Sequence, residues 1–240
     1  MLPLRDINPT RTTPFVNWLL ILANVFVFVK FLSLPPWYQT GYSLVPSRFF
    51  GDPLGEAFTI VTSMFMHAGL AHLGGNMLFL WIFGDNIEDA LGHGRYLAFY
   101  LLGGLAAATA QVVTSGASPI PMVGASGAIA AVTGAYLVLY PRAPVLMLNP
   151  FPPLWLFVGL TFVIPAWFVA GEFFVTNLFM GLQTIGERAS GADAKGGVAV
   201  FAHLGGFLFG LLTIRPLMPE KPRSSRRDWD GWRPPPPRRA

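Results

Sequence analysis

The chain has 240 residues, of which 53% are apolar and only 12% are charged, and its mean hydropathy is +0.52. A typical soluble domain carries about 25% charged residues, so this composition excludes an ordinary soluble protein and a largely disordered one, and indicates an integral membrane protein. The chain contains no cysteine, which excludes disulfide frameworks, thiolate metal sites and a cysteine nucleophile.

Six apolar windows follow one another along the chain. They are Phe15–Leu34, Ala57–Phe83, about Tyr96–Thr114, Gly124–Tyr140, part of Leu154–Ile185, and Gly197–Ile214. Backbone groups in lipid must be satisfied within the segment, and no window alternates with the period of a transmembrane β-strand. We therefore predict an all-α membrane protein with a bundle of six transmembrane helices. The first window is long and lacks a signal-peptide cleavage site, so we expect it to be an anchor.

The fifth window leaves two boundaries open. A span of Leu154–Ala170 would leave Glu172 outside the membrane, whereas a span of about Thr161–Leu182 would include it. We favour the second boundary, with residues 145–160 lying along the membrane surface.

Six spans place both termini on one side of the membrane. Four arginines in the N-terminal segment and the loops of that side, together with eight basic residues of the tail, make 12 of the 16 Lys and Arg residues. The positive-inside rule therefore places both termini in the cytoplasm, and we expect a multi-pass protein of a bacterial inner membrane.

Three regions follow from this topology. Residues 1–14 form a cytoplasmic segment, 15–214 form the six-span domain, and 215–240 form a basic, proline-rich tail that we predict to be disordered. The tail carries eight basic and three acidic residues. It could bind anionic lipid or remain a solvated anchor on the inner side, and we favour the second interpretation. The basic patch is too small to indicate nucleic-acid binding.

Uncharged polar side chains within the windows are informative because lipid makes them costly. His72 and Asn76 share one face of the second helix, whereas His67 points about 140° away. They reach the depth of Ser126, at the start of the fourth window, only if the second helix proper begins near His67. His203 lies about one third of the way along the sixth window. Taken singly, each residue has an ordinary explanation, as a back-bonded serine or an interhelical hydrogen-bonding group.

Ser126 and His203 together have a stronger interpretation. Strips of small residues would let their two helices approach closely: Ala130, Gly134, Ala199, Gly206 and Gly210. A serine hydroxyl becomes nucleophilic when a neutral imidazole takes its proton. The start of a helix also offers free N–H groups to an oxyanion. Because no carboxylate is placed to orient His203, the pattern predicts a Ser–His dyad.

These residues together resemble the rhomboid family of intramembrane serine proteases. The second, fourth and sixth windows carry, in the family's order, H-x4-H-x3-N (His67, His72, Asn76), G-x-S-G (Gly124, Ser126, Gly127) and A-H-x-G-G-F (Ala202, His203, Gly205, Gly206, Phe207). The turn after the second window resembles the family's G-x3-E-x3-G, with Gly84, Glu88 and Gly92.

The resemblance implies that Ser126 is the nucleophile and that His203 is the general base and then the acid. It implies an oxyanion hole formed by His72, Asn76 and the backbone N–H of Ser126. Three further residues would support the site: Gly124, Gly127 and His67. Substrates would be transmembrane proteins with one span, cut in or near its outer part. No metal or organic cofactor is implied, the lipid bilayer is the other expected partner, and the sequence carries no signal for an oligomeric state.

Two positions depart from the family pattern. The first outer loop has Arg48 without the Trp-Arg pair of some members, and Ala130 stands where some members have an aromatic residue that stacks on the histidine. Glu172 leaves two interpretations open, a pH-dependent gate or a bond to a neighbouring loop, and we favour the second.

Two alternative functions remain at this stage. One is a catalytically silent family member that acts in binding or quality control, although such members generally lack the serine or the histidine. The other is a small transporter that uses its histidines, which predicts a polar path across both leaflets. The inner ends of the windows are apolar, which favours the protease.

Overall fold

The computed structural model describes residues 2–149, 151–155, 159–189 and 199–219. In chain order the elements are β1 (Leu2–Asp6), α1 (Phe15–Leu32), α2 (Pro36–Tyr42), α3 (Pro46–Gly51), α4 (Pro53–Thr62), the 3-10 helix η1 (Ser63–Phe65), α5 (Leu70–Leu91), α6 (His93–Ser115), α7 (Ser126–Leu139), β2 (Pro144–Leu148), the 3-10 helix η2 (Pro152–Leu154), β3 (Thr161–Pro165), α9 (Ala166–Ala189) and α10 (Val200–Leu217). Residues 220–240 of the tail that we predict to be disordered lie outside this description. The prediction is wrong at the start of the tail, where Arg215–Leu217 form the end of α10.

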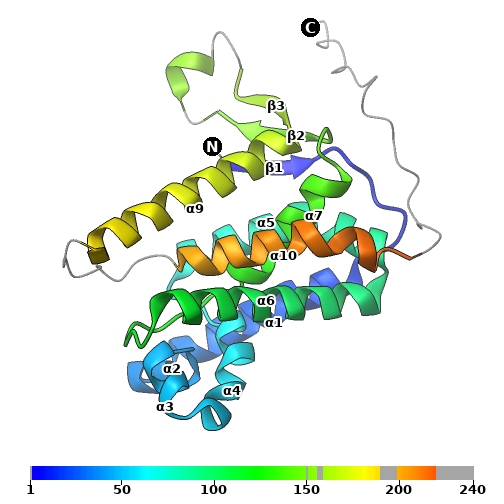
Figure 1. Cartoon of the computed structure of the whole chain (residues 1–240). Helices are drawn as coiled ribbons and strands as arrows, with labels where there is room; N and C mark the ends of the chain where they lie inside the picture. The colour runs from blue at the N-terminus through cyan, green and yellow to red at the C-terminus, as the bar shows by residue number, and fades with distance from the viewer. Residues whose placement is uncertain (1, 150, 156–158, 190–198, 220–240) are drawn as a thin grey trace, which may run out of the picture.

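The helices form one membrane bundle (Figure 1). By length and composition α1, α6, α9 and α10 can each cross a bilayer, and α4 with η1 and α5 can do so as one bent pair. The remaining window is the shorter apolar helix α7. The predicted helical membrane bundle is thereby confirmed, and the protein is an integral membrane protein.

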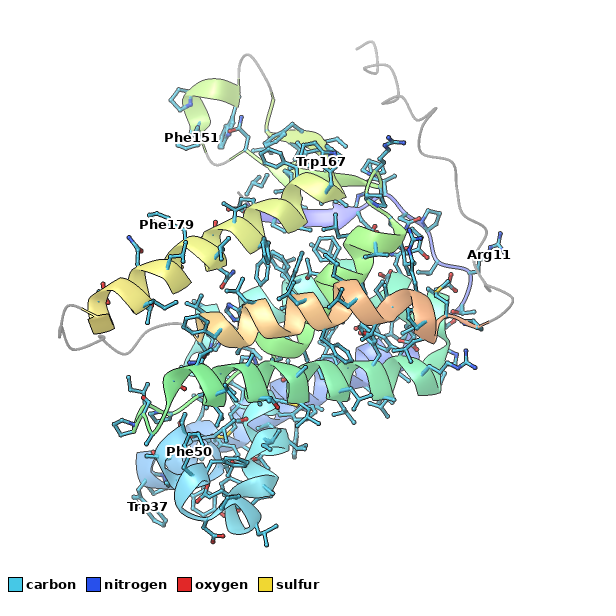
Figure 2. The ribbon with its side chains drawn as sticks, in the orientation of Figure 1. Arg11, Trp37, Phe50, Phe151, Trp167 and Phe179 are labelled. Carbon is cyan, nitrogen blue, oxygen red and sulfur yellow. The ribbon has the colours of Figure 1, made fainter. Side chains whose placement is uncertain are left out.

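The outer surface of this bundle is apolar. Figure 2 shows Phe179 on the side of α9 that points away from the other helices, and its side chain is 61% exposed. Trp37, on α2, is 72% exposed and lies at the opposite edge of the molecule. Large exposed apolar side chains on so many helices are what lipid contact requires, whereas a water-soluble protein would cover this area with polar groups.

The short helix α7 lies at the centre of the bundle, and every residue from Gly127 to Tyr136 is buried. Its 14 residues span about 21 Å, which is less than the roughly 30 Å of a hydrocarbon core. A helix of this length cannot reach both membrane surfaces. If the last residue of α7 lies at one membrane surface, Ser126, the first residue of α7, therefore lies below the other surface.

Helices α7 and α10 cross so closely that the crossing requires glycine. A Cβ atom added to Gly206 would lie 2.0 Å from the carbonyl oxygen of Gly127, and one added to Gly210 would lie 1.9 Å from that of Ala131. Small residues allow such backbone approach within a membrane. The predicted close contact between the fourth and sixth spans is confirmed.

We expect Gly210→Ala to lower the free energy of unfolding by about 3 kcal/mol, because the added methyl group forces α10 away from α7. The matched control is Gly171→Ala in α9, where an added Cβ meets no atom within 4 Å. That control gains helix propensity and is expected to unfold no earlier than wild type. Thermal unfolding in detergent, followed by circular dichroism, measures both variants, and equal midpoints for the two would contradict the prediction.

A sharp break divides the second window. The axis of α4 and η1 is turned by 79° from that of α5, which begins at Leu70. His67 lies in the break, and the helix proper starts three residues after it. This is the condition under which His72 and Asn76 reach the depth of Ser126.

A small antiparallel sheet, β1–β2–β3, packs at the opposite end of the bundle from Ser126, and we call this end the sheet end (Figure 1). The helical prediction was therefore wrong for residues 161–165. Strand β3 pairs with β2 through partners such as Ile164 and Val145, and short apolar runs with β-branched residues do not distinguish strand from helix by periodicity. Helix α9 begins only at Ala166 and contains Glu172, so the boundary Leu154–Ala170 was wrong and the favoured one starts five residues early.

Two carboxylates near the end of α5 hold the start of the first span. Glu88 is fully buried and accepts hydrogen bonds from the backbone N–H groups of Val16, at 3.0 Å, and Asn17, at 2.7 Å. Asp89 accepts from the backbone N–H of Thr12 at 2.9 Å and from its hydroxyl at 2.6 Å. N–H groups in the first turn of a helix lack helical partners, and a carboxylate there satisfies them and interacts favourably with the helix dipole.

Asp6 ties the sheet to the bundle. Its carboxylate accepts hydrogen bonds from the hydroxyl of Tyr136 at 2.5 Å and from the amide of Asn86 at 3.0 Å. Burial, with a smaller contribution from the nearby Asp85 carboxylate, outweighs the Tyr136 hydrogen bond and raises the pKa of Asp6 from 3.8 to about 7.

This shift predicts a pH-dependent stability. Between pH about 4 and about 7 the folded state holds a proton on Asp6 that the unfolded chain has lost, so the free energy of unfolding falls as the pH rises. We expect Asp6→Asn to remove this contribution and to raise the unfolding midpoint above that of wild type at pH about 8. A series of thermal unfolding curves across this range measures the effect. Parallel pH dependences of the two proteins would show that Asp6 does not contribute.

Candidate active site

Ser126 follows a turn that only glycine can complete. Gly124 has a φ of +127°, in the region that side chains disfavour, and an added Cβ would lie 2.8 Å from the ring of His72. The N–H of Gly124 donates to the carbonyl oxygen of Ser63 at 2.9 Å, which joins this turn to η1. Gly124 is therefore required both by its backbone conformation and by the close approach of His72.

The side chains of Ser126 and His203 meet where α7 and α10 cross. The serine Oγ lies 2.7 Å from Nε2 of His203, although the two residues are 77 positions apart in the sequence. His203 is 8% exposed, and Ser126 is half-buried. Each residue lies in the first turn of its helix, and we call the end of the bundle where these helices begin the site end.

A glutamine of α6 caps the helix that carries His203. The side-chain oxygen of Gln111 accepts a hydrogen bond of 3.1 Å from the backbone N–H of Ala202. This N–H belongs to the first turn of α10 and has no helical acceptor. Gln111 thus fixes the start of α10 next to His203.

Two side chains of α5 face the same space. Asn76 is 8% exposed, and its Nδ2 has no hydrogen-bond partner among the residues that the structure describes. Nδ1 of His72 accepts a long hydrogen bond of 3.5 Å from the backbone N–H of Ala68, which leaves Nε2 as its donor atom. The backbone N–H of Ser126, at the first position of α7, also has no helical acceptor. Three hydrogen-bond donors are therefore available beside the serine hydroxyl: Asn76 Nδ2, His72 Nε2 and the backbone N–H of Ser126.

The polar groups line one cavity of about 620 Å³. His72, Asn76, Ser126 and His203 contribute its polar wall, and small or apolar residues form the rest. The lining residues come from α5, α7, α9 and α10, from the turn that precedes α7, and from the residues Ala68 and Ala199 just before α5 and α10. A cavity with a mostly apolar wall and a few convergent polar groups is the usual form of a small binding site.

Helix α9 adds two contacts to His203 that the sequence reasoning missed. Oδ1 of Asn177 lies 2.6 Å from Nδ1 of His203, and the ring of Phe173 lies 5.7 Å from the imidazole, centroid to centroid. The signal that could have found Asn177 is the one that singled out Asn76, an uncharged amide in an apolar window.

Comparison with known proteins decides the family. A model of the Rhomboid domain matches residues 54–220. The chain belongs to the rhomboid family. The matched segment contains α5, α6, α7, α9 and α10, and hence all the side chains that line the cavity or contact His203.

Curated relatives include bacterial and mitochondrial rhomboids. The chain is 42% identical over 83 residues to the Rhomboid protease GluP of Bacillus subtilis, which covers 35% of this chain and 16% of that protein. It is 34% identical over 134 residues to the Putative rhomboid protease YdcA of Bacillus subtilis, covering 53% of this chain and 63% of that protein. It is also 29% identical over 170 residues to Rhomboid protein 1, mitochondrial, of Saccharomyces cerevisiae, covering 67% and 42%. The chain thus spans less than two thirds of each of these relatives.

In this rhomboid, Arg48 organises the segment between the first two spans. Its guanidinium donates to the carbonyl oxygens of Thr40 and Ser43, each at 2.9 Å, and to the carboxylate of Glu56 at 2.8 Å. This segment is joined to the turn before Ser126 by an isolated β-bridge between residues 44 and 122. Arg48 therefore supports the site from a distance.

The other residues singled out in the sequence take no part in the contact between Ser126 and His203. His67 is buried and packs edge-on against His72, with ring centroids 5.1 Å apart. An added Cβ on Gly127 would lie 2.5 Å from Cβ of Ala107, so this glycine allows α6 to approach α7. Glu172 is exposed on α9, and it forms no hydrogen bond or ion pair with the residues that the structure describes. Within the same described part of the chain, no three His, Asp or Glu side chains form a group that could hold a metal ion.

Proposed function

We propose that this rhomboid is an intramembrane serine endopeptidase that cleaves single-span membrane proteins in or near the outer part of their transmembrane helices. The observation that carries the proposal is the 2.7 Å contact between Ser126 Oγ and His203 Nε2 at the wall of the cavity. A hydroxyl in this contact can pass its proton to the imidazole as it attacks a carbonyl carbon. The names of two bacterial relatives as proteases support the proposal.

The reaction would proceed through an acyl-enzyme. As the Oγ of Ser126 bonds to the carbonyl carbon, Nε2 of His203 takes the hydroxyl proton, and the carbonyl oxygen becomes an oxyanion. When the C–N bond breaks, the leaving nitrogen receives that proton. A water molecule then attacks the ester, passing a proton to Nε2, and the Oγ leaves with a proton returned from the same nitrogen.

The oxyanion hole would comprise Asn76 Nδ2, His72 Nε2 and the backbone N–H of Ser126. Nδ2 of Asn76 is buried and has no hydrogen-bond partner in the described part of the chain, which supports this role, because a buried donor without a partner is costly unless a ligand uses it. Donors that are already in place need no reorganisation when the negative charge develops, which is why such groups contribute strongly to catalysis.

The kind of substrate segment that we expect follows from the way a helix shields its peptide bonds. A peptide bond inside a helix is shielded by its own turn, so the substrate segment must unwind to reach Ser126. Small and helix-weakening residues are therefore expected at the cut. The cavity is lined by residues of both α5 and α9, and we expect such an extended segment to enter it between these helices.

We further propose that the site end faces the outside and that both termini are cytoplasmic, in a bacterial inner membrane. Basic residues near the sheet end support this orientation by the positive-inside rule: Arg5, Arg11, Arg95, Arg142 and Arg215. The division into residues 1–14, 15–214 and 215–240 remains a prediction.

The test uses purified protein in detergent, a fluorophosphonate probe that labels activated serines, and a panel of single-span reporters. We expect the probe to label wild type and not Ser126→Ala, and mass spectrometry to locate the cut within the outer part of the reporter helix. Equal labelling of the two proteins would overturn the proposal. Reporter binding with neither cleavage nor labelling would identify a catalytically silent member instead.

A further inference from the structure

Asn177 is a buried polar residue of α9 to which the mechanism proposed above assigns no role. It is 7% exposed, and both of its polar side-chain atoms have partners. A buried amide in a membrane span is costly unless it is hydrogen-bonded, so its contacts are the first place to look for its role.

The two contacts of Asn177 fix the direction of its amide. Nδ2 donates a 2.8 Å hydrogen bond to the carbonyl oxygen of Phe173, which can only accept. The other atom, Oδ1, therefore faces Nδ1 of His203 at 2.6 Å. Because Oδ1 can only accept, Nδ1 of His203 must carry the hydrogen and donate it.

The proton on Nδ1 decides the chemistry at the other nitrogen. A neutral imidazole carries one hydrogen, so protonation of Nδ1 leaves the lone pair on Nε2. Nε2 is the atom that lies 2.7 Å from the Oγ of Ser126. The amide thus selects the tautomer in which His203 can accept the serine proton.

We propose that Asn177 is the positioning residue of the general base, and that it holds the tautomer and orientation of His203 from α9. The proposal rests on the serine endopeptidase function proposed above. In many serine proteases an aspartate orients the imidazole of the catalytic histidine. Here a neutral amide would orient it, so that no carboxylate has to be placed in the bilayer.

A second contact from the same helix supports this role. Phe173 precedes Asn177 by four residues and shares its helix face. Its ring is tilted by 44° to the imidazole, with centroids 5.7 Å apart. The residue four positions after the serine is Ala130, which has no ring to offer. The imidazole is therefore held by two residues of α9, a helix at the edge of the bundle (Figure 1).

The competing explanation is that Asn177 only ties α9 to α10. Phe174→Ala is the matched control, because Phe174 packs on Phe207 of α10 with ring centroids 5.1 Å apart and does not line the cavity. Asn177→Leu removes the acceptor, whereas Asn177→Asp keeps an acceptor oxygen at the same distance along the side chain. The three variants and wild type are compared in detergent for kcat, KM and the imidazole ¹⁵N spectrum.

We expect Asn177→Leu to lower kcat by about 10²-fold, since misplacement of a reacting group costs roughly this much. KM should change by less than about twofold, because Asn177 is not among the residues that line the cavity. Asn177→Asp should keep kcat within about tenfold of wild type, and Phe174→Ala should keep full turnover. In ¹⁵N-histidine protein, with the His203 signal assigned by its loss in His203→Ala, wild type should show Nδ1 protonated and Asn177→Leu a mixture of tautomers.

Three outcomes would overturn the positioning role. They are an unchanged kcat in Asn177→Leu, an equal loss in Phe174→Ala, or an Nδ1-protonated His203 that persists in Asn177→Leu. An inactive, unlabelled wild type would instead refute the proposed function. In that case the tautomer measurement still tests the hydrogen bond on its own.

Discussion

Ser126→Ala and His203→Ala are each expected to reduce reporter cleavage to the detection limit. In a soluble serine protease the removal of the serine or the histidine costs about 10⁶-fold in kcat, because neither residue works without the other. The double variant should therefore be no slower than either single variant. Quantitative cleavage assays with each protein at the same concentration in detergent measure the three rates.

Ser47→Ala is the control for this experiment. Ser47 lies in α3 at the site end, and its side chain does not line the cavity. Ser47→Ala should cleave like wild type. The free energy of unfolding of Ser126→Ala should lie within about 1 kcal/mol of that of wild type, because Ser126 is only half-buried. Cleavage by Ser126→Ala above about a tenth of the wild-type rate would refute the nucleophile assignment.

Asn76→Ala is expected to lower kcat by about 10²–10³-fold with little change in KM. Loss of one oxyanion donor has this cost because the donor acts on charge that develops only in the transition state. Asn76→Asp should be impaired as well, since a carboxylate fills the same space but cannot donate when ionised. Steady-state kinetics on a single-span reporter measure both variants.

The matched control for Asn76 is Asn24→Ala. Asn24 is fully buried in α1 and donates to the carbonyl oxygen of Leu20, away from the cavity. Its replacement is expected to lower stability by about 1 kcal/mol and to leave kcat unchanged. If Asn76→Ala behaves like Asn24→Ala, Asn76 serves only as an interhelical hydrogen-bonding residue.

The spans were predictable because the signal for a membrane helix is local. Five of the six windows match helices, four of them with shifts of a few residues at their ends. In the second window, α5 continues eight residues beyond Phe83, through the segment expected to be a turn. The break before Leu70 had been stated only as the condition under which His72 reaches the depth of Ser126. The sheet was not anticipated. The run Thr161–Pro165 is apolar like the span that follows it, and its strand partner lies in β2, so only tertiary pairing reveals its conformation.

The contact between Ser126 and His203 was predictable, whereas the contacts around it were not. Ser126 and His203 were found because strips of small residues point to the α7–α10 crossing. Asn177 was overlooked because no spacing connects it with His203, which is 26 residues away on another helix. The absence of a carboxylate suggested an isolated dyad, whereas the structure adds a neutral amide as a third group.

The sequence by itself determined that this is a membrane protein, and it singled out the residues to which we assign the proposed chemistry, because hydropathy and residue type are properties of the chain alone. Only the tertiary structure decided which groups touch. The carboxylate of Glu88 meets the first turn of α1, and the amide of Asn177 meets the imidazole of His203. Such contacts depend on the distance and angle between helices, which follow from the packing of the whole bundle and not from hydropathy or residue type.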